Sequence, residues 1–138
     1  MNDKIPSDKV SFQHSFKVTL EDIDGLGHVN NVTYLKWTQQ VAGMHWEKLS
    51  SEKMRENVMW FVLRHEIDYV QQAFVNDAII VYTWIEDAKG ARSNRMFRIY
   101  RDDELLVKCK TTWALIDVKT QKPKRIEDEI MDLFVKND

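Results

Sequence analysis

Cysteine, proline and glycine are all scarce in this sequence of 138 residues. Cys109 is the only cysteine, so no disulfide can form within the chain. This is compatible with a protein of a reducing compartment. Two prolines and four glycines leave little of the composition that is typical of disordered or low-complexity segments. The chain length suits one domain, and we expect residues 1–138 to form it.

Long apolar runs and an excess of basic residues are also missing. No run approaches the roughly 20 apolar residues of a membrane-spanning helix, and residues 1–9 lack the apolar core of a signal peptide. The 20 basic and 22 acidic residues give a net charge of -2, which argues against nucleic acid as the main partner. We therefore expect a cytoplasmic protein that binds neither nucleic acid nor a membrane.

Two hydrophobic periods are present instead. Alternation over 10–20 predicts a half-buried strand, and residues 21–27, with two glycines and two aspartates, predict a loop. From about Asn31 to Leu49 the period is helical, which predicts a helix with a wide apolar face and Asn30 as its N-cap. After a polar link at 50–57, we expect strands at 61–69, 78–84, 91–101 and 105–118, hairpin turns at 89–90 and 102–103, and a short helix within 126–135.

This order of elements predicts an α+β fold, with an antiparallel sheet packed on a single central helix. One helix covers only one face of such a sheet. The other face and the edges need cover as well, and a homodimer or homotetramer would provide it.

The segment from Asp22 to Trp37 carries most of the functional information. It places two carboxylates, a histidine and two amides on a loop that runs into the predicted helix. The unpaired N–H groups at a helix start can stabilise a developing oxyanion. A carboxylate a few residues earlier can attack a carbonyl or draw a proton from water. On spacing alone, however, a capping or turn-forming aspartate is the more common case.

The same segment resembles the motif of the 4-hydroxybenzoyl-CoA thioesterase-like branch of the hotdog superfamily. That motif is Asp-x-Asp-x-x-Gly-His-Val-Asn-Asn-x-x-Tyr with an aromatic residue shortly after. It is complete here in Asp22, Asp24, Gly27, His28, Val29, Asn30, Asn31, Tyr34 and Trp37. The stretch from Trp113 to Ile126 is similar to the last strand and tail of acyl-acyl-carrier-protein thioesterases. The resemblance implies a single hotdog domain, in which an antiparallel sheet wraps around one long central helix.

For function, the resemblance implies hydrolysis of an acyl-CoA or acyl-carrier-protein thioester, with a fatty acyl group favoured by analogy. Asp24 matches the family's catalytic carboxylate, which acts as nucleophile or general base. The N–H near Asn31 matches the amide that polarises the thioester carbonyl. His28 is a further predicted catalytic residue, and Asn30 and Tyr34 are predicted to bind substrate. For Asp22, a loop-stabilising role is at least as good an interpretation as a catalytic one.

The acyl chain is expected in an apolar tunnel between helix and sheet, near a subunit boundary. Carrier-protein thioesterases usually join two hotdog repeats in one chain, and this chain has room for one. The missing half would therefore come from a second subunit. No metal or redox cofactor is implied.

Five basic residues fall on one predicted hairpin: Lys89, Arg92, Arg95, Arg98 and Arg101. They could dock the phosphates of coenzyme A or an acidic carrier protein, and Arg92 and Arg95 are predicted to bind substrate in this way. Alternation puts Arg92 and Arg98 on one face of the strand and Arg95 and Arg101 on the other. A solvated strand face is an equally good interpretation.

The other histidines and the tryptophans have ordinary structural interpretations. His14, His45 and His65 lie within alternating or helical patterns and show no metal spacing, so we expect them to be packed or hydrogen-bonded. The five tryptophans are expected to fill core and interfaces.

Two alternative functions remain open. One is a hotdog enoyl-CoA hydratase, whose motif resembles Asp-x-Asn-Pro-x-His; here His28 follows Asp24 by four positions rather than five, and no such proline is present. The other is a non-catalytic acyl-binding protein of the same fold. Thiol release, hydration of enoyl-CoA, or binding without turnover would distinguish the three.

Overall fold

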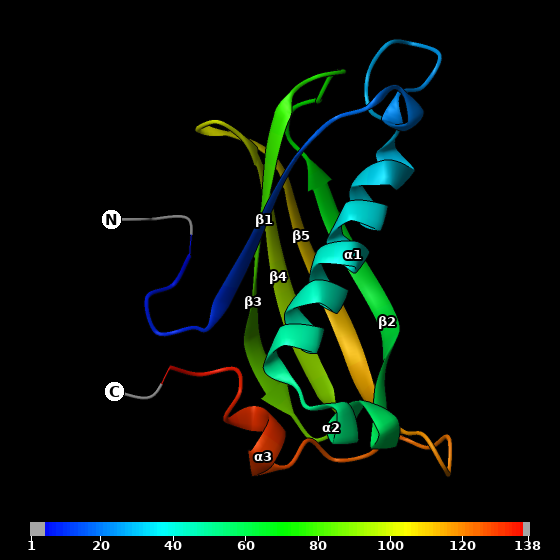
Figure 1. Cartoon of the computed structure of the whole chain (residues 1–138), viewed down its shortest axis with the longest axis vertical. Helices are drawn as coiled ribbons and strands as arrows, with labels where there is room; N and C mark the ends of the chain where they lie inside the picture. Colours follow the sequence, from blue (N-terminus) through cyan, green and yellow to red (C-terminus); the bar gives the residue numbers. More distant parts are fainter. Residues whose placement is uncertain (1–4, 137–138) are drawn as a thin grey trace.

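The computed structural model describes residues 5–136, and its strands form one antiparallel sheet beside a long helix (Figure 1). The strand order in the sheet is β1-β3-β4-β5-β2. The α+β fold with one long helix against an antiparallel sheet is therefore confirmed. In chain order the elements are β1 (Ser11–Lys17), the 3-10 helix η1 (Leu20–Asp22), α1 (Asn31–Leu49), α2 (Glu52–Asn57), β2 (Val58–Tyr69), β3 (Ala78–Lys89), β4 (Arg92–Arg101), β5 (Glu104–Asp117) and α3 (Asp128–Met131).

Helix α1 has the predicted bounds and the predicted cap. The Oδ1 atom of Asn30 accepts a hydrogen bond from the Val32 N–H at 3.0 Å, which satisfies one free amide of the first turn. The buried residues of α1 recur every three or four positions, so a single stripe of the helix faces the sheet. Met44, which the helical period places on the apolar face, is 40% exposed because the stripe is narrower than predicted. The stripe consists of Tyr34, Trp37, Thr38, Val41, Ala42 and His45.

Alternation within each strand decides which side chains face α1. On β4, Phe97 and Ile99 are fully buried and belong to the same core cluster as Trp37 and Val41 of α1. Arg95 lies two positions before Phe97 and is also buried. The sheet therefore presents a charged residue, as well as apolar ones, to the helix.

Several element boundaries differ from the predicted ones. The stretch 50–57, expected to be a polar link, contains α2, whose first turn is capped by Ser51 Oγ accepting from the Met54 N–H at 3.1 Å. Strand β1 ends at Lys17 and Leu20 is 79% exposed, because the chain turns into η1. The predicted strand at 78–84 continues to Lys89 in β3. The predicted C-terminal helix is confined to Asp128–Met131.

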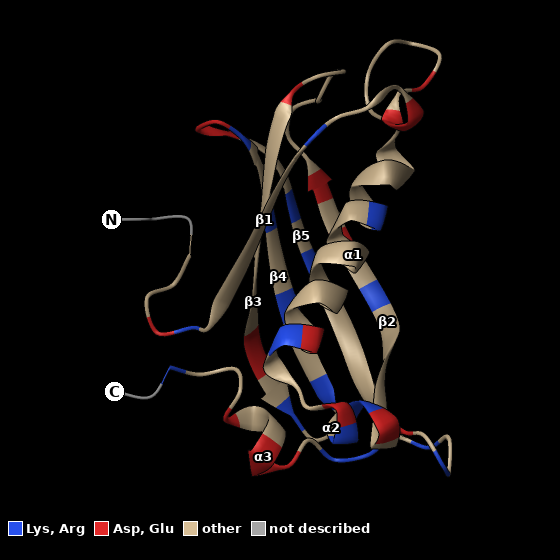
Figure 2. Cartoon of the chain, viewed as in Figure 1, with Lys and Arg blue, Asp and Glu red and all other residues tan. Residues whose placement is uncertain are grey.

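The two edges of the sheet are β1 and β2. Tyr69 is exposed at the end of β2, and three aliphatic or aromatic side chains nearer its start are exposed as well: Met59, Phe61 and Leu63. An edge strand with exposed apolar residues is suited to pairing with another chain. Acidic residues lie mainly toward the two ends of the molecule, basic residues also occur midway along β2, β4 and β5, and α1 carries few charges along its length (Figure 2). Among residues 5–136, no helix combines the length and the apolar character that crossing a bilayer requires.

Gly43 is the one glycine within α1, and it offers a test of the helix. A Cβ added there would meet no atom within 4 Å. Because glycine in a helix costs up to about 1 kcal/mol relative to alanine, Gly43→Ala is expected to raise the free energy of unfolding by about 0.5–1 kcal/mol. Urea denaturation measures this change. Gly27→Ala is the matched control: Gly27 has φ +88, so its replacement should destabilise the chain. A loss of stability with Gly43→Ala would contradict the packing described for α1.

Candidate active site

The loop before α1 folds back on itself as a small hairpin at residues 23–29, here called the Asp24 hairpin. Ile23 and Val29 pair as an antiparallel bridge, and the Asp24 N–H donates to the His28 carbonyl at 2.9 Å. The Gly27 N–H donates to the Asp24 carbonyl at 3.2 Å. Gly27 takes φ +88, a conformation that glycine adopts without steric cost. These hydrogen bonds place Asp24 and His28 opposite each other in the hairpin.

One hydrogen bond orients the Asp24 carboxylate, and its second oxygen lies near His28. Oδ1 accepts a hydrogen bond from the Leu26 N–H at 2.8 Å. Oδ2 lies 3.3 Å from Nδ1 of His28, and the two side chains are 27% and 23% exposed. An N–H at Nδ1 would donate to this oxygen and leave Nε2 of His28 as an acceptor. The carboxylate is therefore oriented, yet remains accessible from one side.

The start of α1 is anchored to the link between β2 and β3. The Val29 N–H donates to the Ala73 carbonyl at 2.9 Å, and the Ala73 N–H donates to the hydroxyl of Tyr34 at 2.8 Å. The hydroxyl of Tyr69 donates to the Asn31 carbonyl at 3.1 Å. Tyr34 is only 1% exposed, and burial raises the pKa of its phenol. Its placement makes it an anchor beneath the hairpin, and its predicted contact with substrate stays a prediction.

Asn30 is the N-cap of α1 and Asn31 is its first residue, and both residues are exposed. The side-chain oxygen of Asn30 is engaged in the cap. The Asn31 N–H, by contrast, donates to no acceptor among the described residues. It points from the positive end of a helix of 19 residues, where an anion or oxyanion is stabilised.

Asp22 has the contacts of a structural residue. Its Oδ2 accepts from the Thr19 N–H at 3.0 Å and from the Thr19 hydroxyl at 3.2 Å, which closes the turn of η1. Its carbonyl accepts from the Asn30 N–H at 3.1 Å. These bonds support the loop-stabilising interpretation of Asp22.

The basic residues of the β3–β4 hairpin do not form one patch. Arg92 is exposed at the start of β4, whereas Arg95 is buried toward α1. Arg98 lies over the Trp84 ring at 5.4 Å, and Arg101 pairs with Asp77 at 2.7 Å. The structure thus places Arg92 and Arg95 on opposite faces of the sheet. Arg92 also lies at the far end of β4, about 30 Å along the strand from Arg101, the end near the Asp24 hairpin.

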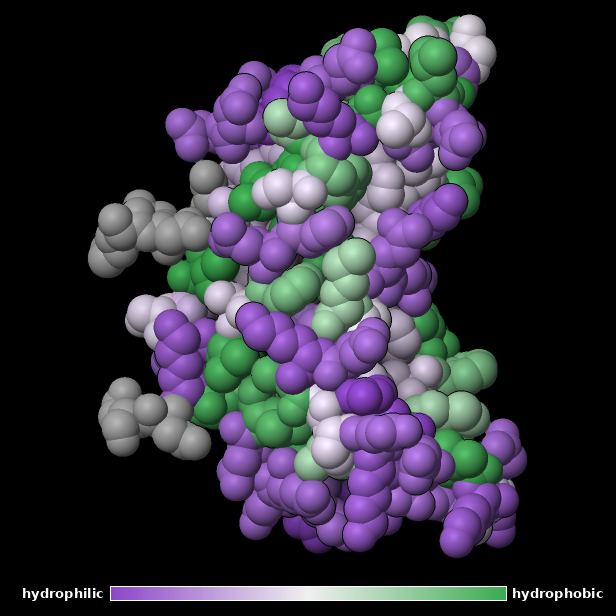
Figure 3. Space-filling view, viewed as in Figure 1, coloured by the Kyte–Doolittle hydropathy of each residue, from purple (hydrophilic) through white to green (hydrophobic). Residues whose placement is uncertain are grey.

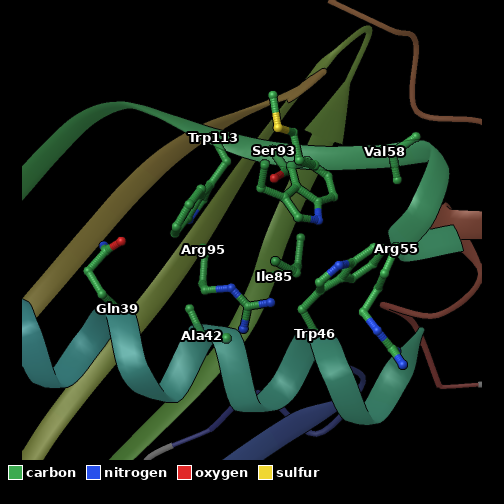
Figure 4. A pocket seen from close by; sticks show the side chains of 12 residues that line it. Gln39, Ala42, Trp46, Arg55, Val58, Ile85, Ser93, Arg95 and Trp113 are labelled. Carbon is green, nitrogen blue, oxygen red and sulfur yellow. The ribbon is translucent and has the colours of Figure 1, made fainter. Parts of the chain in front are cut away.

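An apolar cavity of about 310 Å³ lies between the second half of α1 and the sheet (Figure 4). Three indoles line it, from Trp46, Trp60 and Trp113, and we call it the tryptophan cavity. Its place between helix and sheet agrees with the predicted tunnel. It does not adjoin the Asp24 hairpin, however, because its first lining residue on α1 is Gln39, and the helical rise from Asn31 to Gln39 is about 12 Å.

A buried polar pair borders this cavity, and sequence reasoning missed it. Nη1 of Arg95 donates to Nδ1 of His45 at 2.9 Å and to the Thr83 hydroxyl at 3.1 Å. Burial, together with the charges of Arg95 and Lys48, lowers the pKa of His45 to about 3. His45 is therefore neutral, with Nδ1 as the acceptor. The sequence did contain a signal for this pair. Arg95 alternates in phase with the apolar Phe97, and His45 lies at helical spacing with the apolar residues of α1, so both side chains could be expected to face the core.

The remaining predicted features are placed as follows. The packed or hydrogen-bonded interpretation holds for His45 and for His65, whose Nδ1 lies 2.9 Å from the Thr111 hydroxyl. Trp37 and Trp84 are core residues, whereas Trp46, Trp60 and Trp113 line the cavity. Within residues 5–136, no group of three or more His, Cys, Asp or Glu side chains is arranged to hold a metal ion.

Hydrophobic side chains are exposed around the Asp24 hairpin. Leu26 is 81% exposed and Val32 is 71% exposed. Figure 3 shows hydrophobic residues at the end of the molecule where the hairpin leads into α1. Exposed apolar residues beside an oriented carboxylate indicate a surface that another molecule covers.

Comparisons with known proteins place this geometry in context. The family model described as "Acyl-ACP thioesterase N-terminal domain" matches residues 9–134. An acyl-[acyl-carrier-protein] hydrolase of Cuphea viscosissima is 23% identical over 93% of this chain, which spans only 34% of that protein. The long-chain acyl-CoA thioesterase FadM of Escherichia coli is 22% identical over 87% of this chain and 94% of its own length. The crystal structure of a 1,4-dihydroxy-2-naphthoyl-CoA thioesterase from Synechocystis has the same fold, with a TM-score of 0.78 at 18% identity over 90% of this chain and 95% of that one.

The depressed pKa of His45 predicts a specific pH dependence of stability. Below pH 6.5 the unfolded chain binds a proton at this residue, and the folded chain does not until about pH 3. The contribution of neutral His45 to the free energy of unfolding is therefore fully present above pH 6.5. It decreases as the pH drops toward 3, by up to about 1.4 kcal/mol per pH unit. His45→Gln keeps an acceptor for Arg95 but cannot titrate. The stability difference between wild type and variant, from urea denaturation at several pH values, should shift in the variant's favour through this window. A constant difference would show that His45 is not held neutral.

Proposed function

We propose that this chain cleaves fatty acyl thioesters of coenzyme A or acyl carrier protein at the Asp24 hairpin. The chain belongs to the acyl-ACP thioesterase N-terminal domain family and is a thioester hydrolase. One observation carries the proposal. An oriented carboxylate, fixed by the Leu26 N–H at 2.8 Å, lies on the loop that enters α1, and the first amide of that helix is free.

The chemistry follows from these two groups. The thioester carbonyl oxygen would accept a hydrogen bond from the Asn31 N–H, and the positive end of α1 would stabilise the charge that develops there. Asp24 would either attack the carbonyl carbon or take a proton from the attacking water. The bond to sulfur then breaks and the thiolate leaves. In the first case water hydrolyses the acyl-Asp24 anhydride and restores the carboxylate.

His28 has a positioning role in this proposal. An N–H at Nδ1, 3.3 Å from Oδ2 of Asp24, keeps the carboxylate turned toward the substrate. Its exposed side can also contact the substrate, as can the Asn30 and Asn31 side chains. Arg92, exposed at the start of β4, is retained as a candidate contact for the carrier rather than for the acyl group.

A second copy of the chain would complete the site. Strand β2 is an edge with Met59, Phe61 and Leu63 exposed. If two copies pair β2 antiparallel about a two-fold axis, the partner is inverted. The second half of its α1, with the tryptophan cavity, then comes beside the Asp24 hairpin of the first copy. The acyl chain would bind in one subunit while its thioester meets Asp24 of the other, in a homodimer or a larger assembly of such dimers.

The first prediction from this proposal concerns Asp24. Asp24→Asn keeps the hydrogen-bonding shape but removes the charge, so turnover of an acyl-CoA substrate should fall by about 10²–10⁴-fold. A thiol-release assay measures it. Glu21→Gln, on exposed η1, is the matched control and should leave turnover unchanged. Circular dichroism should show the same fold in all three proteins. Equal rates in wild type and Asp24→Asn would remove Asp24 from the mechanism.

The second prediction isolates the helix-start amide. Asn31→Pro removes the backbone N–H at the first position of α1, where proline is well tolerated. Asn30 has φ -63 and ψ 137, which a following proline allows. We expect kcat to fall by about 10²–10³-fold with little change in stability. Asn31→Ala keeps the N–H and is the control for loss of the side chain. If both variants lose activity equally, the side chain and not the amide is the contributing group.

A further inference from the structure

Arg95 is a buried cation without an acidic partner. It is 5% exposed, and among the described residues its two hydrogen bonds, to His45 and Thr83, both use Nη1. The donors at Nε and Nη2 have no described protein acceptor. A buried charge without a counter-ion is costly, and an anion bound beside it would offset that cost.

Two further donors at the cavity wall also lack partners. They are Nε2 of Gln39 and Nε1 of Trp113, both buried and without a hydrogen bond. In Figure 4 the Arg95 guanidinium reaches from β4 toward α1 near Ala42, and Gln39 and Trp113 lie to one side of it. The described residues that line the cavity include no aspartate or glutamate. Donors without acceptors predict a ligand that brings acceptors.

Most of the remaining wall is apolar, and the exceptions are Ser93 and Arg55, whose Nη1 already donates to the carbonyls of Glu47 and Ser50. The three indoles, with Met59 and Ile85, suit a hydrocarbon chain rather than a phosphate or a pantetheine arm. A ligand that fits both parts is therefore apolar along its length and anionic at one end. A guanidinium binds carboxylates and phosphates through two parallel hydrogen bonds, and a carboxylate is the smaller of the two at the end of a hydrocarbon chain.

We propose that the tryptophan cavity binds an acyl group whose far end carries a carboxylate, with Arg95 as the residue that selects it. The preferred substrates are then ω-carboxyacyl thioesters. This inference rests on the proposed thioesterase function and names the substrate class. It also changes the expected role of Arg95, from docking coenzyme A phosphates to recognising the acyl end.

The test compares matched pairs of acyl-CoA thioesters, with and without a terminal carboxylate, in even chain lengths from hexanoyl to hexadecanoyl. Arg95→Met keeps a long side chain and removes the charge. Lys110→Met, on the outer face of β5, removes a charge from the opposite side of the sheet and is the matched control. Arg95→Met removes a desolvated charge but leaves Nδ1 of His45 and the Thr83 hydroxyl without this donor, so circular dichroism and urea denaturation must show that the variant folds.

At the best chain length, the wild type and Lys110→Met should have higher kcat/KM for the carboxylated thioester, by about 10- to 100-fold. Arg95→Met should lose this preference and should retain or gain activity on the plain acyl-CoA. A wild-type preference for plain chains at every length would overturn the proposal. So would a preference for the carboxylated chain that survives in Arg95→Met.

A binding measurement separates this inference from the proposed function. S-alkyl-CoA thioethers with and without a terminal carboxylate cannot be hydrolysed, and calorimetry gives their affinities for wild type and Arg95→Met. If no thioester is cleaved but the carboxylated thioether binds more tightly in an Arg95-dependent way, the proposed function fails and the cavity assignment stands. If the carboxylated thioether has no advantage, the cavity assignment is wrong whatever the turnover.

Discussion

One backbone residue, Ala73, ties the Asp24 hairpin to the long helix. Its carbonyl accepts from Val29 at the end of the hairpin, and its N–H donates to Tyr34 in the first turn of α1. Because the hairpin and the helix start are bound to the same residue, neither can move far relative to the other. The carboxylate of Asp24 and the free amide of Asn31 are thus preorganised by the fold, which is the condition for electrostatic stabilisation of an oxyanion.

The two ends of α1 have different properties. The first end has an oriented carboxylate and a free amide but is open at the surface, with Leu26 and Val32 exposed. The second end has a mostly apolar cavity with the buried Arg95, and the wall of this cavity on α1 begins at Gln39, about 12 Å along the helix from Asn31. The first end therefore has the reactive groups without an enclosed cavity, and the second end has the cavity without a carboxylate among the described residues that line it. An inverted second copy across the β2 edge would bring opposite ends together, which accounts for the apolar side chains that β2 leaves exposed.

Local features of this chain were predictable and long-range ones were not. The bounds of α1 and the Asn30 cap depend on residues within a few positions of each other, so the sequence pattern was sufficient. Strand β3 runs to Lys89 because its pairing with β4 resumes at Asp87 after a register shift at Glu86, and the polarity of these two residues interrupts the apolar pattern. The alternation of residues along β4 placed Arg95 and Arg92 on opposite faces of the strand. The sequence pattern did not show which face is buried, because that depends on the packing of α1 against the sheet. The cavity is lined by residues of six elements, α1, α2, β2, β3, β4 and β5, and no single segment predicts it.

The dependence of the site on two copies of the chain can be measured by mixing inactive variants. One variant, Asp24→Asn, keeps its cavity; the other, Gly43→Trp, keeps Asp24 but fills the cavity from α1. Refolded separately, each should be inactive. Refolded together, mixed dimers would join an intact Asp24 hairpin to an intact cavity, and about a quarter of wild-type activity should return. If the mixture stays inactive while mixed dimers form, Asp24 and the cavity of the same chain act together, and the two-copy site is wrong.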